Sequence, residues 1–140
     1  MSDQQVFVDS PILICAHDNL AGPKRDLARD HISELWEKEG SAFISISVLE
    51  EFYARLVSAN VSAFEAQQAV IDYLEWGVIE QDAALLQEAF SLQVRWKLEF
   101  AQAKVLAAAR RSGASVLWTD RFPEDQDYDG VVTKNPLVSP

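Results

Sequence analysis

Apolar and polar residues along the chain fall into short blocks that predict strands and helices in alternation. Compact apolar runs predict buried strands at residues 6–8, 42–46, 76–80, 114–119 and 131–133. Apolar residues at helical spacing predict helices over 12–17, 24–39, 48–57 and 99–112, and two more that begin at Ser62 and Asp82. Strands that alternate with helices are typical of an α/β fold with a mostly parallel sheet covered on both faces.

Capping residues refine the starts of two of these helices. Ser47 followed three residues later by Glu50 fits a capping box, which predicts that Ser47 starts a helix and leaves the neighbouring Glu51 free for another role. Ser62 and Glu65 have the same spacing and predict the start of the following helix.

The composition is that of one globular domain over residues 1–140, with 49% hydrophobic residues. The 22 acidic and 12 basic residues give a net charge of −10, so any contact with nucleic acid is expected to be local or metal-mediated. The single cysteine, Cys15, excludes an intrachain disulfide framework. The sequence lacks the pattern of a membrane span or a signal peptide, which predicts a cytoplasmic protein.

The histidines and tryptophans do not point to a catalytic site. His17 and His31 lack a third ligand at a suitable spacing, and we expect both to be surface or helix-end residues rather than metal ligands. The four tryptophans lie in or beside apolar faces and are expected in the core or in a dimer interface.

Acidic residues lie at or just beyond the ends of three predicted strands. Asp9 directly follows the first strand, Glu51 lies one turn into the helix after the second, and Asp120 follows the penultimate strand. Because the carboxyl ends of parallel strands meet at one edge of a sheet, these side chains are expected to lie together there. Carboxylates without histidine or cysteine partners suit Mg²⁺ or Mn²⁺. The alternative is that all three are solvated caps and loop acids.

Four segments in the same order resemble a PIN domain of the VapC-like toxin type. These segments are VFVDSPILICAHD (6–18), SISVLEEFYA (45–54), the alanine-rich stretch and strand at 107–119, and YDGVVTKNP (128–136). The resemblance implies a three-layer α/β/α fold with a five-stranded parallel sheet, in which Asp9 and Glu51 match metal ligands. It also implies hydrolysis of RNA phosphodiester bonds with a carboxylate-bound divalent metal, an antitoxin partner and frequent homodimerisation.

The chain departs from the pattern of this family within the expected site. Gln102 occupies the position where the family has its third acid, and Glu99, three residues earlier on the helix, is the expected substitute ligand. After Thr119, Asp120 is followed by Arg121, which is expected to contact a phosphate or to offset part of the acidic field. With fewer acids, metal binding is expected to be weaker.

Three interpretations follow from the sequence. The first is an endoribonuclease that uses Mg²⁺ or Mn²⁺, with Asp9, Glu51 and Asp120 as catalytic residues and metal ligands, and Glu99 as a further ligand. Its expected substrate-binding residues are Ser10, Gln102, Thr119 and Arg121. The second is a catalytically inactive PIN-fold module that binds an antitoxin-like partner or RNA, which Gln102 and Arg121 favour. The third is another doubly wound fold, phosphatase-like or receiver-like, although the chain has no nucleophile motif or glycine-rich turn.

Overall fold

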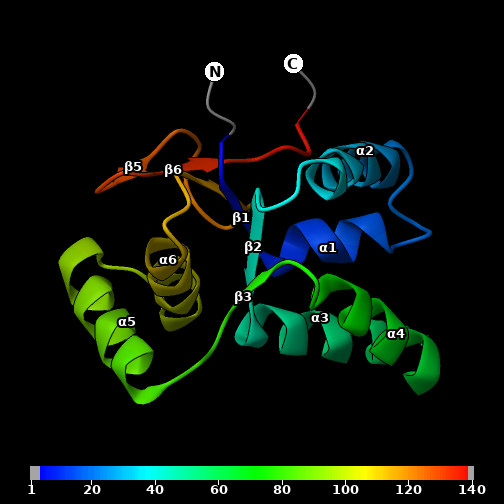
Figure 1. Cartoon of the computed structure of the whole chain (residues 1–140), viewed down its shortest axis with the longest axis horizontal. Helices are drawn as coiled ribbons and strands as arrows, with labels where there is room; N and C mark the ends of the chain where they lie inside the picture. Colours follow the sequence, from blue (N-terminus) through cyan, green and yellow to red (C-terminus); the bar gives the residue numbers. More distant parts are fainter. Residues whose placement is uncertain (1–3, 139–140) are drawn as a thin grey trace.

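The central element of the structure is a sheet with the strand order β3-β2-β1-β4-β6-β5 (Figure 1). The computed structural model describes residues 4–138. The strands are β1 Val6–Val8, β2 Ala42–Ser45, β3 Gly77–Ile79, β4 Val116–Trp118, β5 Asp127–Tyr128 and β6 Val131–Lys134. Five of them run parallel, as predicted, and the two-residue β5 pairs antiparallel with β6 at the edge of the sheet.

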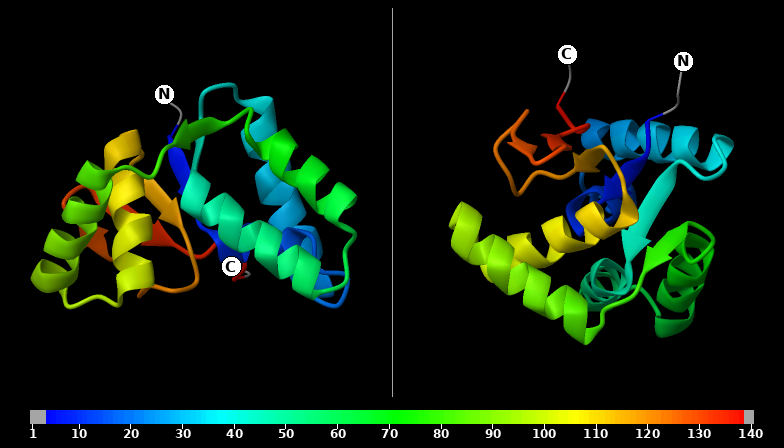
Figure 2. Two further views of the ribbon diagram at one scale, coloured as in Figure 1. Left: turned by 90° about the horizontal axis from the view of Figure 1, so that it is seen from below. Right: turned by 60° about the vertical axis from the view of Figure 1, so that its left-hand side comes forward.

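Helices cover both sides of this sheet. They are α1 Ser10–Ala16, α2 Pro23–Glu37, α3 Ile46–Ser58, α4 Ala63–Tyr73, α5 Ala83–Trp96 and α6 Phe100–Ser112. In the left view of Figure 2, α5 and α6 lie to one side of the strands and α1 to α4 to the other. This arrangement confirms the predicted three-layer α/β/α fold. Within residues 4–138, no helix combines the length and apolar character needed to cross a membrane.

The core forms where the central strands meet the helices. Phe7, Val8, Ile44 and Leu117 on β1, β2 and β4 are fully buried. Helices cover both faces of these strands, which explains why their sequences are continuous apolar runs rather than alternating ones. The helices contribute further fully buried side chains, including Ile12, Leu13, Phe52, Leu85 and Leu106.

The position of β1 at the centre of the sheet determines which polar residues meet. Because β1 pairs in parallel with both β2 and β4, its carboxyl end lies beside the carboxyl ends of both neighbours. The backbone N–H of Asp9 donates to the carbonyl of Trp118 at 2.9 Å, which ties the residue after β1 to the end of β4. Open α/β sheets bind ligands at such an edge.

The start of α3 differs from the prediction. Ser45, not Ser47, is the N-cap, and its Oγ accepts the backbone N–H of Val48 at 3.1 Å. Ser47 lies inside the helix, where its Oγ accepts a hydrogen bond from Lys104 Nζ at 3.2 Å. The predicted strand was one residue too long, and this error moved the predicted cap from the last strand residue into the helix. The predicted caps at Ser62 and Asp82 are confirmed.

The two histidines also differ from the expectation of surface positions. His17 is at the end of α1, which agrees with the expected helix-end position. It is half-buried, however, with its ring against Phe52 and Tyr73. Its Nε2 lies 3.0 Å from the Tyr73 hydroxyl, and burial lowers the pKa of His17. The half-buried His31 packs edge-on against Trp118. Tertiary packing covers both rings, against helices α3 and α4 for His17 and against strand β4 for His31, and sequence spacing does not reveal it.

We expect Ser45→Ala to lower the free energy of unfolding by about 1 kcal/mol, because it removes the oxygen that accepts the N–H of Val48 at the start of α3. Ser47→Ala is the matched control and should change stability by less than about 0.5 kcal/mol. Urea denaturation of both variants measures the difference. A larger loss for Ser47→Ala would contradict Ser45 as the cap.

Candidate functional site

A pocket of about 640 Å³ lies at the carboxyl edge of the central strands, and we call it the strand-edge pocket. Acidic and basic side chains line it together, among them Glu51, Asp120, Arg121, Lys24 and Arg55. Ser10 also lines it and separates it from Asp9, which has no exposed surface. Of the three predicted strand-end acids, two therefore line one pocket and the third is buried directly beside it.

Asp9 caps α1 and is held as a carboxylate by donors on both of its oxygens. Its Oδ1 accepts the backbone N–H of Ser10 at 2.8 Å, and its Oδ2 accepts the hydroxyl of Thr119 at 2.8 Å. Burial raises the pKa of Asp9, whereas the hydrogen bonds and charge of Arg121 oppose this rise. Since every partner donates a hydrogen, the geometry suits the ionised form.

The guanidinium of Arg121 lies between the carboxylates of Asp9 and Glu51. Toward Asp9, Nη2 donates to Oδ1 at 2.6 Å and Nε to Oδ2 at 3.1 Å. Toward Glu51, Nη2 donates to Oε1 at 3.1 Å and Nη1 to Oε2 at 3.2 Å. Burial alone would lower the pKa of Arg121, but the hydrogen bonds and charges of both acids raise it. Arg121 therefore makes two-pronged contacts with both carboxylates, the strongest kind of ion pair.

Glu51 is the accessible acid of this group, with 46% of its side chain exposed. The hydroxyl of Ser10 donates to its Oε1. Burial would raise the pKa of Glu51, but the hydrogen bonds from Ser10 and Arg121 outweigh this and lower it below its ordinary value. Glu51 is consequently ionised at neutral pH and reachable from the pocket.

Gln102 contacts the backbone of Arg121 and not its guanidinium. Its Nε2 donates to the carbonyl of Arg121 at 2.6 Å, and its Oε1 accepts the backbone N–H of Glu99 at the start of α6. The backbone N–H of Arg121 donates to Thr119 Oγ1 at 3.0 Å. Both polar atoms of the Arg121 backbone are therefore held by side chains from β4 and α6.

Neither of the other two predicted ligands has a side chain that pairs with Arg121 in the described part of the chain. Asp120 is exposed and lines the strand-edge pocket, and Glu99 is the exposed N-cap residue of α6. Within residues 4–138, no group of three His, Cys, Asp or Glu side chains is arranged to hold one metal ion. The ligand set of Asp9, Glu51, Asp120 and Glu99 remains a prediction.

Comparisons with known proteins agree on the fold. No protein-family model and no curated protein matches the sequence. The VapC20 toxin of Mycobacterium tuberculosis, which cleaves the sarcin-ricin loop, is similar in structure, with a TM-score of 0.63 and 22% identity over 86% of this chain and 92% of that one. A toxin-antitoxin complex from Klebsiella pneumoniae is also similar, with a TM-score of 0.69 and 19% identity over 92% of this chain and 97% of that one. VapBC2 of Rickettsia felis, bound to a DNA fragment from its promoter, has a TM-score of 0.65 and 16% identity over 93% of this chain and 97% of that one.

The chain has the PIN-like fold of the VapC toxins. At these identities the likeness establishes the fold alone. Within the PIN-like fold, Asp9, Glu51 and Arg121 form the candidate site because they are the charged groups that the parallel strands bring together.

Two basic residues of the strand-edge pocket were missed from the sequence. Lys24 lies at the start of α2, where nothing in the local pattern indicates a site. Arg55 lies four residues after Glu51 on α3, a spacing that places both side chains on one face of the helix. That spacing is a usable signal in the sequence for a basic residue near Glu51.

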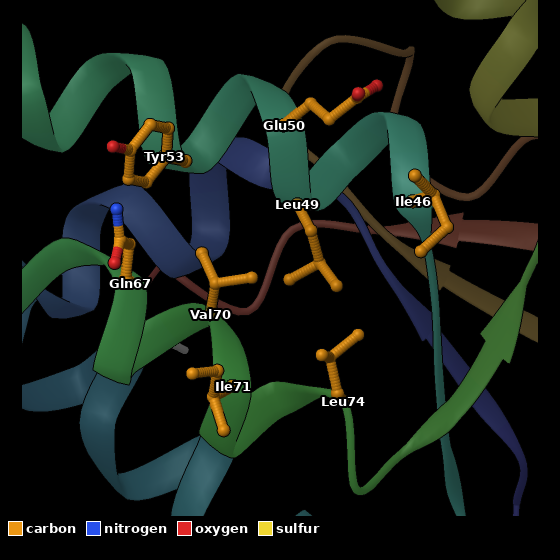
Figure 3. A pocket seen from close by; sticks show the side chains of 8 residues that line it. All are labelled: Ile46, Leu49, Glu50, Tyr53, Gln67, Val70, Ile71 and Leu74. Atoms are coloured by element: carbon orange, nitrogen blue, oxygen red, sulfur yellow. The ribbon is translucent and has the colours of Figure 1, made fainter.

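A second pocket, of about 590 Å³, lies between α3 and α4 and differs in character (Figure 3). Its lining is mostly aliphatic, with Leu49, Val70 and Leu74 facing the space between the helices. Glu50 is the one charged side chain among the eight residues that line it. Without paired charges it suits packing rather than chemistry, so the strand-edge pocket is the candidate site.

We expect Arg121→Met to destabilise the protein by about 3 kcal/mol at pH 7, because it leaves the buried carboxylate of Asp9 without its counter-charge. Without Arg121, burial raises the pKa of Asp9 further above its unfolded value. A carboxyl shifted upward contributes stability that is present at low pH and lost as the pH rises through its folded pKa. The loss should therefore be smaller at pH 4 than at pH 7.

Chemical denaturation at the two pH values measures this difference. Arg55→Met, which changes an exposed arginine of the same pocket, is the matched control and should change stability little at either pH. An equal loss at both pH values for Arg121→Met would show that the arginine does not compensate a buried charge.

Proposed function

We propose that this protein is a ribonuclease toxin of a toxin-antitoxin module, which hydrolyses RNA phosphodiester bonds at the strand-edge pocket. The observation that carries the proposal is the meeting of Asp9, Glu51 and Arg121 at the carboxyl edge of a PIN-like sheet. The structural neighbour from M. tuberculosis is a toxin that cleaves the sarcin-ricin loop, which supports RNA as the substrate class.

The pocket offers donors for a phosphate despite the acidic charge of the whole chain. Asp9 and Glu51 together accept from Nε, Nη1 and Nη2 of Arg121, which leaves one N–H of Nη1 for a phosphate oxygen. Lys24 and Arg55 supply further positive charge in the same pocket. These local contacts do not require a broad basic surface.

Glu51 is the residue that can move a proton in this pocket, since it is ionised and accessible. In the proposed reaction, a water molecule attacks phosphorus and passes a proton to Glu51 as the new bond from oxygen to phosphorus forms. The bond from phosphorus to the leaving oxygen then breaks, and the proton held by Glu51 passes through solvent to that oxygen, which restores the Glu51 carboxylate. Arg121 offsets charge that develops on the phosphate. Asp9, Ser10 and Thr119 fix the geometry of the arginine and of Glu51.

No step of this reaction is assigned to the predicted Mg²⁺ or Mn²⁺. The carboxylate oxygens that would hold such an ion are already bonded to Arg121, so the donor set does not fit a divalent ion while the guanidinium is in place. Asp120, exposed in the same pocket, is proposed as a further acidic residue of the catalytic site, which acts through its negative charge and transfers no proton.

An antitoxin partner, homodimerisation and a cytoplasmic location belong to the same proposal. One structural neighbour is a toxin-antitoxin complex and another is a VapBC assembly, which supports a protein partner for this chain. The net charge of −10 favours a basic partner. The exposed apolar residues of α5, among them Phe90 and Val94, provide surface that an association of subunits would cover.

The second candidate function is binding without hydrolysis, to RNA or to an antitoxin-like partner. The ion pair of Arg121 with both acids favours it, because a carboxylate engaged by a guanidinium is a weaker proton acceptor than a free one. Under this alternative the pocket retains RNA in a gel-shift experiment, whereas the RNA stays intact.

We expect the purified protein to cut a panel of structured and single-stranded RNAs, and Glu51→Gln to cut them slower by on the order of 10²-fold because it lacks the proton acceptor. Glu50 is next to Glu51 in the chain but lines the pocket between α3 and α4, so Glu50→Gln should cut RNA at the rate of the unchanged protein. Gel electrophoresis of end-labelled RNA measures the rates. RNA left intact by the unchanged protein, or equal rates for both variants, would contradict the proposal.

A further inference from the structure

Arg121 takes up the acceptor positions that Ser10 and Thr119 leave on the buried carboxylate of Asp9. Asp9 receives four hydrogen bonds, from the Ser10 N–H, the Thr119 hydroxyl, and Nε and Nη2 of Arg121. An ionised carboxylate offers about four lone-pair positions, so no acceptor position of Asp9 remains for a metal ion.

The charge balance leads to the same result. The two carboxylates of Asp9 and Glu51 carry two negative charges, and the guanidinium between them supplies one positive charge. Without Arg121, these like charges would repel unless a cation or a proton compensated them. The guanidinium thus already supplies the compensation that a bound cation would give.

Gln102 and Arg121 form one unit in the structure, although they lie far apart in the chain. The side-chain N–H of Gln102 donates to the Arg121 carbonyl at 2.6 Å, while its Oε1 is used at the start of α6. An ionised acid at position 102 would have no hydrogen to donate and would face that carbonyl oxygen with a negative charge. The two residues that depart from the expected acidic pattern therefore support each other.

We propose that Arg121 is an internal counter-ion that takes the place of a divalent cation in this site, with Gln102 as its positioning residue. The proposal rests on the proposed function only in placing the site at the strand-edge pocket. The protein holds its acidic pair without metal and does not bind Mn²⁺ there. Removing the guanidinium opens a cation site between Asp9 and Glu51.

Calorimetric titration of Mn²⁺ into the full chain at neutral pH tests this. We expect no saturable binding to the unchanged protein and one bound ion in Arg121→Ala. The double variant Asp9→Asn with Arg121→Ala should lose the gained site, because the ion would be held by Asp9. One Mn²⁺ bound to the unchanged protein and lost in Glu51→Gln would overturn the proposal, as would a folded Arg121→Ala variant that binds none.

Thermal unfolding of the unchanged protein keeps the test decisive if Arg121→Ala does not fold. A melting temperature that is the same with Mn²⁺ and with EDTA supports the proposal, because a ligand that binds the folded state raises it. A rise with Mn²⁺ that disappears in Glu51→Gln overturns it.

Gln102→Glu tests the positioning role separately. The added carboxylate cannot donate the hydrogen bond to the Arg121 carbonyl, so we expect it to loosen the hold on the arginine and to give measurable Mn²⁺ binding where the unchanged protein has none. Gln87→Glu, on the exposed face of α5, adds the same charge elsewhere and should leave binding unchanged. Equal Mn²⁺ binding by the two variants would show that Gln102 does not position Arg121.

These measurements separate this inference from the ribonuclease proposal. If Arg121→Ala gains Mn²⁺ but no form of the protein cuts RNA, the counter-ion role stands and the ribonuclease proposal fails. If the unchanged protein binds Mn²⁺ at Glu51 and cuts RNA, the ribonuclease proposal stands and the counter-ion role fails.

Discussion

The buried carboxylate of Asp9 sets the requirements for the rest of the site. Removing an ionised carboxylate from water costs several kcal/mol unless charges and hydrogen bonds compensate it. Here the compensation comes from three separate places in the chain: the first turn of α1, the end of β4 and the loop that follows β4. Asp9 therefore requires that β1 and β4 lie side by side and that α1 begin at this edge.

The chemistry of this compensation explains why an arginine suits the position. A guanidinium is a planar fork with five donors and stays charged, so it can satisfy two carboxylates with fixed geometry. A lysine ammonium is a flexible point charge and would not bridge Asp9 and Glu51 in this two-pronged way. A divalent ion such as Mg²⁺ would neutralise both charges but would demand oxygen atoms in a near-octahedral arrangement, with several waters beside the carboxylates. The arginine gives a site with one net negative charge that is rigid by itself.

The fold and part of the site follow from local sequence features. The apolar runs at β1, β2 and β4 predicted buried parallel strands, and the position of an acid directly after β1 predicted its place at the carboxyl edge of the sheet. The meeting of Asp9 and Glu51 also followed, because both lie where neighbouring parallel strands end. The cap at Ser45 did not follow from the sequence, since Ser45 and Ser47, with one residue between them, are distinguished as caps only by backbone geometry.

The sequence by itself determined the five parallel strands, the layers and the pair of acids, because burial of apolar runs and the parallel sheet are set by patterns within short segments, whereas the two-residue edge strand β5 was not predicted. Only the tertiary structure decided what the acids bind. The side chain of Arg121 reaches Asp9 and Glu51, which lie 112 and 70 positions earlier in the chain. Gln102 on α6 holds the Arg121 backbone. Such long-range hydrogen bonds depend on distances and directions in three dimensions, which a one-dimensional pattern of residue types does not contain.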